Sequence, residues 1–170
     1  MSTLDSAIKE SINIKKKLKK KTFKINIINK LLFSCLQNNK KILICGNGGS
    51  AADADHLATE FIVRLRPKIN RQALKIFSLT FNTSVITATG NDYGFKRIFD
   101  RNLEAIGEQG DVLIVLTTSG NSANILNVLK LAKKMGIYSI GFLGNKGGKA
   151  KNLCDDSIII PSNNTARIQE

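Results

Sequence analysis

Residues 41–65 read KILICGNGGSAADADHLATEFIVRL, a short apolar run followed by a glycine-rich loop and a helical pattern. The run at 41–45 predicts a buried strand, and the pattern at 51–65 predicts a helix. The alternation continues along the chain, and further strands are expected at 73–79, 112–116, 138–143 and 157–160. Further helices are expected at 83–108, with a break at 90–94, and at 123–135.

This order of elements predicts one domain over residues 1–170 with an α/β fold. We expect a five-stranded parallel sheet flanked by helices in a flavodoxin-like, three-layer arrangement. Residues 3–36 have helical spacing and contain neither Pro nor Gly, so they predict one long N-terminal helix. In this domain, 1–36 would pack against another subunit and 40–170 would form the α/β core.

The charge of the chain is strongly positive, with a formal net charge of +13. Ten lysines fall within residues 1–40, and most of them lie in KKKLKKKTFK (15–24). This cluster has no arginine and one aromatic residue, Phe23, so bidentate contacts and stacking on bases are poorly supplied and nucleic-acid binding is disfavoured. We expect a solvated helix face whose field helps to attract an anionic substrate.

Two further features concern the compartment. The sequence has no run of the roughly 18 apolar residues that a membrane helix needs, and MSTLDSAIKE (1–10) lacks the order of a signal peptide. We therefore expect a cytoplasmic protein without a membrane partner. The cysteines Cys35, Cys45 and Cys154 are far apart, so they predict neither a disulfide framework nor a cysteine zinc site.

The loop GNGGS (46–50) follows the first expected strand, at the edge where parallel sheets bind ligands. Its glycines allow a close approach of the backbone, and Ser50 can cap a helix whose free N–H groups attract an anion. A dinucleotide site is the rival interpretation, because Gly46-x-Gly48-x-x-Ala51 fits G-x-G-x-x-G/A. Such a site also needs an acidic residue about 20 positions later. None occurs between Glu60 and Asp92, which disfavours the rival.

The loop TTSGNS (117–122) follows another expected strand and holds four hydroxyl groups in six residues. Hydroxyls beside a helix N-terminus suit a phosphate monoester, whereas a capped turn would need only one of them. We therefore expect phosphate binding here.

The helix expected at 51–65 carries His56, Glu60 and Arg64 at four-residue intervals, nearly on one face. Taken alone, these three side chains could form a surface salt-bridge ladder. Beside a glycine loop, the His/Glu pair could instead ligate a metal, and the carboxylate could move protons on a sugar.

Four stretches resemble the SIS-domain phosphoheptose isomerases, namely GNGGSAADADHLATEF (46–61), TATGNDYGF (87–95), GDVLIVLTTSGNSANI (110–125) and NTARIQE (164–170). The resemblance implies an aldose–ketose isomerase that converts sedoheptulose 7-phosphate to D-glycero-D-manno-heptose 7-phosphate. This reaction belongs to ADP-heptose biosynthesis for lipopolysaccharide core or capsule. The resemblance also implies bound Zn²⁺ and a homotetramer with sites at subunit interfaces.

The resemblance further implies roles for individual residues. Glu60 would be the catalytic acid/base, and His56, Glu60 and Gln169 would bind the metal. The substrate would be bound by Asn47, Gly48, Gly49, Ser50, Glu60, Arg64, Asn91, Asp92, Thr117, Thr118, Ser119, Ser122 and Gln169.

One family feature has no match in this sequence. The family has a second catalytic histidine after its RIQE motif, whereas His56 is the only histidine here and the sequence ends at Glu170. We therefore expect a missing C-terminal helix, no fourth zinc ligand in this chain and an impaired enzyme. The alternative is a non-catalytic SIS protein that binds a sugar phosphate or a replication-initiator partner.

Overall fold

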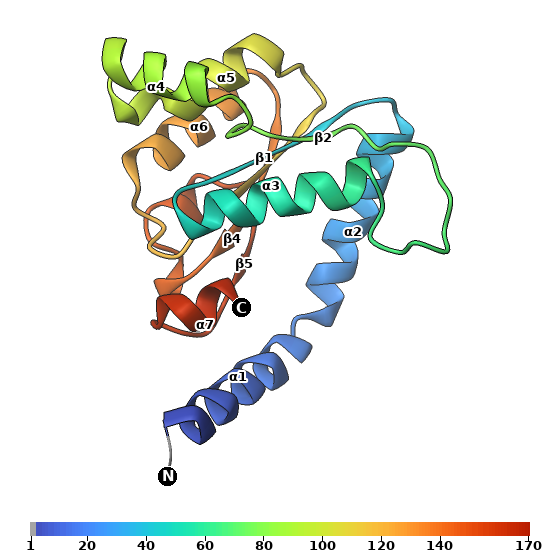
Figure 1. Ribbon diagram of the computed structural model, residues 1–170, viewed down its shortest axis with the longest axis vertical. Coiled ribbons are helices and arrows are strands. Elements are labelled where there is room, and N and C mark those ends of the chain that lie inside the picture. Colours follow the sequence, from blue (N-terminus) through green and yellow to red (C-terminus); the bar gives the residue numbers. More distant parts are fainter. Residues whose placement is uncertain (1–2) are drawn as a thin grey trace.

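The computed structural model describes residues 3–170 and contains one five-stranded sheet, in the order β2-β1-β3-β4-β5 (Figure 1). All its neighbouring strands are parallel. The strands are β1 (Ile42–Gly46), β2 (Ile76–Ser78), β3 (Val112–Thr117), β4 (Tyr138–Leu143) and β5 (Asp156–Ile159). The expected five-stranded parallel sheet is confirmed, and its order is the flavodoxin-like one.

The strand order reverses between β1 and β3. From β1 the chain turns outward to β2, and β3 then pairs with the other side of β1 before β4 and β5 follow. Such a reversal opens a crevice at the carboxyl ends of the two strands, which is where open α/β sheets bind ligands. The register pairs Gly46 with Leu116, so the loops after β1 and β3 start side by side.

Alternating side chains of the strands supply two cores. Leu43 and Leu113 pack into one core with residues of α5 (Ile98–Ile106) and α6 (Ala123–Lys134). Ile42 and Ile44 point to the opposite face and pack with Ala54 of α3 (Gly49–Ile62). Figure 1 shows α3 crossing in front of the strands. A parallel sheet with both faces apolar needs this cover on both sides, so the three-layer expectation is confirmed.

The expectation of one N-terminal helix over 3–36 is wrong, because the structure has α1 (Thr3–Lys19) and α2 (Thr22–Gln37). The break falls at Lys20 and Lys21, where the Lys21 N–H bonds the Leu18 carbonyl three residues back at 2.8 Å. The Thr22 hydroxyl donates to the Lys19 carbonyl at 2.6 Å and closes the turn. Consecutive lysines with like charges offer little to hold a straight helix through this point.

The predicted helix at 51–65 is too long, since α3 ends at Ile62. The side chain of Arg71 returns to this end and donates to the carbonyls of Glu60 at 2.9 Å and Phe61 at 2.7 Å. A guanidinium that satisfies the last free carbonyls stabilises a helix end and complements its dipole. Arg64 therefore lies outside α3, and the expected single face with His56 and Glu60 stops at Glu60.

The predicted helical region at 83–108 divides at Gly94, whose φ of 83° suits glycine. The other elements are α4 (Thr83–Asp92), η1 (Phe95–Arg97), η2 (Asn145–Gly147), η3 (Ala150–Asn152) and α7 (Thr165–Gln169).

Within residues 3–170, no helix is long and apolar enough to cross a membrane. The three cysteines are free, and burial raises the pKa of the Cys154 thiol to about 12.

Candidate active site

The glycine-rich loop after β1 is tightly closed. A β-carbon at Gly46 would lie 2.6 Å from the Ser50 β-carbon, so only glycine fits there. Gly48 has a φ of 56° and precedes the first residue of α3. The N–H groups of Ser50 and Ala51 turn back to the carbonyls of Asn47 and Gly48, each at 3.0 Å. The loop thus places the start of α3 at the crevice.

The Asn47 side chain forms a reciprocal amide pair with Asn124 in the first turn of α6. The Asn47 Nδ2 donates to the Asn124 Oδ1 at 2.9 Å, and the Asn124 Nδ2 donates to the Asn47 Oδ1 at 2.8 Å. Asn124 is only 2% exposed and also accepts the Ile125 N–H at 2.9 Å. The sequence analysis did not identify Asn124, although it follows the hydroxyl-rich loop by two residues.

The hydroxyl-rich loop after β3 uses some of its hydroxyls to hold its own shape. The Thr117 hydroxyl accepts the Gly120 N–H at 3.1 Å, and the Ser119 hydroxyl accepts the Asn121 N–H at 3.2 Å. Ser122 stands at the N-cap of α6, and in the described chain its side chain makes no capping hydrogen bond. An uncapped helix start with a free hydroxyl beside it suits an anion.

The segment after β4 forms hydrogen bonds to the hydroxyl-rich loop. The Ala150 N–H donates to the Gly120 carbonyl at 2.9 Å, and the Lys149 N–H donates to the Asn121 Oδ1 at 3.1 Å. Gly120 has a φ of 65°, and a side chain there would run into the backbone of Gly147. The loop is therefore shaped before any ligand arrives.

On α3, His56 and Glu60 face each other across one turn. Their Nε2 and Oε1 atoms are 3.3 Å apart, and their side chains are 74% and 28% exposed. Among residues 3–170 no three His, Cys, Asp or Glu side chains group as a metal site. The pair offers one nitrogen and one carboxylate, whereas zinc usually takes three or four protein ligands. His56 and Glu60 would therefore need further ligands, such as the predicted Gln169, to hold zinc.

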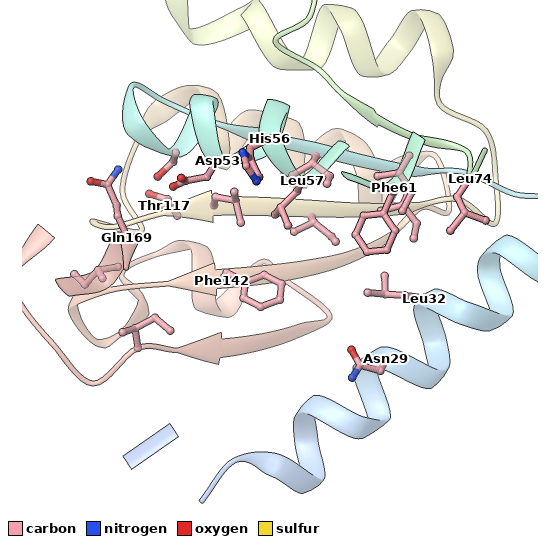
Figure 2. A pocket seen from close by; sticks show the side chains of 18 of the residues that line it. Asn29, Leu32, Asp53, His56, Leu57, Phe61, Leu74, Thr117, Phe142 and Gln169 are labelled. Atoms are coloured by element: carbon pink, nitrogen blue, oxygen red, sulfur yellow. The ribbon is translucent and has the colours of Figure 1, made fainter. Parts of the chain in front are cut away.

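A pocket of about 700 Å³ is lined by His56 of this pair and runs between α2 and α3 over the sheet (Figure 2). The predicted residues that line it are Ser50, His56, Thr117, Thr118 and Gln169. Figure 2 shows Gln169, Thr117 and Asp53 at one end, while Phe142, Leu32 and Phe61 lie farther along. Asp53 was not predicted, although it precedes His56 by three residues on α3.

Gln169 reaches the glycine-rich loop from the far end of the sequence. A β-carbon at Gly49 would collide with the Gln169 side chain, so the two residues are in contact. The side chain of Glu170 holds α7 against α1, accepting the Ser11 hydroxyl at 2.5 Å and lying 3.0 Å from the Lys15 Nζ. The N-terminal helix thereby helps to place Gln169.

Several predicted residues do not line this pocket, namely Asn47, Gly48, Gly49, Glu60, Arg64, Asn91, Asp92, Ser119 and Ser122. Asn91 and Asp92 are exposed at the end of α4, where the Asn91 Nδ2 donates to the Asp92 Oδ1 at 2.8 Å. Neither lines the pocket within this one chain. Their substrate contact, like that of Arg64, stays a prediction.

Comparison with known proteins agrees with this architecture. The model of the SIS domain family matches residues 8–144. A phosphoheptose isomerase of Clostridium acetobutylicum is 48% identical, with 98% of this chain and 86% of that protein covered. One of Aliarcobacter butzleri is 51% identical, with coverages of 83% and 74%.

Solved structures show the same likeness. The Francisella tularensis phosphoheptose isomerase superposes with a TM-score of 0.92 at 36% identity, covering 99% of this chain and 91% of that one. The Neisseria gonorrhoeae enzyme gives a TM-score of 0.88 at 38% identity, covering 98% and 88%. None of these comparisons supports the expectation of an impaired enzyme. Because the family model matches residues 8–144 and relatives named phosphoheptose isomerases are 48–51% identical over most of the sequence, the chain belongs to the SIS domain family, among its phosphoheptose isomerases.

Proposed function

We propose that this protein is a phosphoheptose isomerase that interconverts sedoheptulose 7-phosphate and D-glycero-D-manno-heptose 7-phosphate. The observation that carries the proposal is a pocket lined by His56, Thr117 and Thr118, with Glu60 3.3 Å from the His56 Nε2. A proton-transfer group and a phosphate-binding loop then meet one substrate. Relatives that are 48–51% identical and named phosphoheptose isomerases support the same reaction.

In this mechanism the substrate phosphate lies at the loop 117–122, held by hydroxyls and by the N-terminus of α6. The open-chain sugar extends toward α3, past the glycine-rich loop and Gln169. Glu60 removes the proton α to the carbonyl, an enediol forms, and the proton returns to the neighbouring carbon. Binding of the phosphate at the far end of the substrate positions the reacting carbons beside the Glu60 carboxylate.

Zinc binding is a proposal of its own, and no step above depends on it. His56 would give an imidazole nitrogen, Glu60 a carboxylate oxygen and Gln169 an amide oxygen. If bound, zinc would polarise the sugar oxygens. The homotetramer is likewise proposed, with α1 and α2 as the packing surface, and the cytoplasmic location stays a prediction.

The decisive experiment is turnover of sedoheptulose 7-phosphate in deuterated water. An enediol route exchanges the migrating proton, so we expect both the aldose product and deuterium at the carbon that receives it. Binding of the sugar phosphate without exchange would instead favour the non-catalytic alternative. If the protein neither binds nor converts the sugar phosphate, the assignment of the pocket is overturned.

A further inference from the structure

We infer that Asn124 is a positioning residue that couples the glycine-rich loop to the hydroxyl-rich loop, so that a change in either amide of the pair weakens ligand binding at the other loop. The inference rests on the proposed function for the identity of the ligand. Asn124 lies in α6, directly after the loop 117–122, while its partner Asn47 lies in the loop after β1. The pair therefore bridges the crevice between the two strands.

The geometry of the pair favours a coupling role over simple packing. Both amides donate and accept, at 2.9 and 2.8 Å, which fixes the orientation of each amide group relative to the other. The Ile125 N–H, at 2.9 Å, takes a further lone pair of the Asn124 oxygen. Asn124 is thus held by its own helix on one side and by Asn47 on the other.

The pair also leaves Asn47 with a free bonding capacity. An amide side chain has two N–H donors and two lone pairs on its oxygen. The pair with Asn124 occupies one donor and one lone pair of Asn47. Asn47 is only half-buried, so its second N–H remains available to a ligand in the crevice. Asn124 therefore does not need to touch the substrate in order to aim a group that does.

Loss of the pair would affect both loops at once. Without Asn124 the Asn47 amide loses its fixed orientation, and without Asn47 the buried Asn124 amide must find other partners or move the first turn of α6. That turn carries the N–H groups proposed to bind phosphate. The affinity for phosphate at the loop after β3 would therefore depend on Asn47, which lies in the loop after β1.

The test measures binding of inorganic phosphate by calorimetry to the full chain and to the variants Asn124→Ala, Asn47→Ala and the double variant. Each single variant is expected to weaken binding roughly five- to thirtyfold, as the loss of two hydrogen bonds implies. The double variant should be no worse than Asn47→Ala alone, because Asn124 acts through its pair with Asn47. Asn47 is less buried than Asn124, so Asn47→Ala can still be measured if Asn124→Ala folds poorly.

Asn127→Ala is the matched control, because Asn127 lies one turn later on α6 and its Nδ2 donates to the Lys96 carbonyl at 3.0 Å. Its phosphate affinity should equal that of the unchanged protein. A purely structural role of Asn124 would show as a lower melting temperature with unchanged phosphate affinity, and would overturn the inference. Additive losses in the double variant would overturn it too. Both outcomes are independent of isomerase turnover, so failure of the proposed reaction is seen separately.

Discussion

At the scale of single residues, the chemistry proposed for this protein depends on one carboxylate. Glu60 is partly shielded on α3, and His56 is 3.3 Å from it. Its backbone carbonyl is held by Arg71 at 2.9 Å, so the last turn of the helix is fixed where the side chain must act. A base works only when it is held within reach of the proton it takes.

Replacing Glu60 by Gln should lower kcat about 10²- to 10⁴-fold, because the amide keeps the shape but cannot take a proton. Initial rates of product formation from sedoheptulose 7-phosphate measure the effect on kcat, and circular dichroism checks the fold. Glu104→Gln is the control, since Glu104 forms an exposed pair with Arg101 at 2.9 Å. Near-normal turnover of the Glu60 variant would show that another group is the base.

A second residue-scale prediction concerns the phosphate. Alanine at both Ser119 and Ser122 should raise the KM for the sugar phosphate by an order of magnitude or more, because hydrogen bonds to a charged group contribute about 1.5–3 kcal/mol each. The exposed Ser84 on α4, changed to Ala, should leave KM unchanged. If KM also stays unchanged in the double variant, the phosphate lies elsewhere.

At the scale of elements, buried polar contacts join segments that the strands alone do not fix. Asp111, which is fully buried, accepts the N–H groups of Lys41 at 3.0 Å and Glu108 at 2.8 Å. Its carboxylate is also 3.0 Å from the Lys41 Nζ. Burial acts to lower the pKa of Lys41, but the hydrogen bond and charge of Asp111 outweigh it and the pKa is raised.

We therefore expect Asp111→Ala to cost about 2–4 kcal/mol of unfolding free energy, since two N–H groups and an ammonium lose their partner. Urea denaturation measures it. Glu108→Ala removes a side chain that is 67% exposed and 3.3 Å from the same lysine. That change should cost less than about 1 kcal/mol, and an equal cost for both would refute the role of Asp111.

The contact between α7 and α1 should depend on pH. Hydrogen bonds from Ser11 and Lys15 hold the pKa of Glu170 below its usual range. A lowered pKa means that the contact contributes fully above the ordinary glutamate value, near 4.5, and is lost as the pH falls through the lowered value. Melting curves of the unchanged protein and of Glu170→Gln should differ at pH 7 and converge in acid. A constant difference across this range would contradict the assignment.

At the scale of the whole molecule, α1 presents an apolar stripe to solvent in the single chain. Leu4 is 68% exposed, and Ile8 and Ile12 are each 49% exposed, at helical spacing on one face. Such a stripe is expected to be covered in an assembly. Figure 1 shows α1 reaching away from the sheet, where another subunit has access to it.

We expect a tetramer by light scattering at micromolar concentration, and smaller species when Ile8 and Ile12 are both changed to Lys. Ser6→Lys, on another face of α1, should leave the mass unchanged. A monomeric unchanged protein would rule the tetramer out.

Much of the molecule follows from local patterns in the sequence. The strands are short apolar runs, and the glycine-rich and hydroxyl-rich loops follow them directly, so strands and loops could be placed from residue types alone. What could not be predicted depends on contacts between distant segments. Arg71 ends α3 before Arg64, and Asn124 pairs with Asn47 across 77 residues. Neither partner is visible from spacing along the chain.

That separation has a consequence for how the protein is made. The glycine-rich loop leaves the ribosome long before β3, its neighbouring strand, and before Asn124, its partner 77 residues later. Parallel pairing between distant segments must close a large loop before it gains stability, which slows folding. During synthesis, β1 therefore waits with its apolar side chains uncovered and without the backbone partner β3, and a chaperone that shields this strand should raise the yield of folded protein.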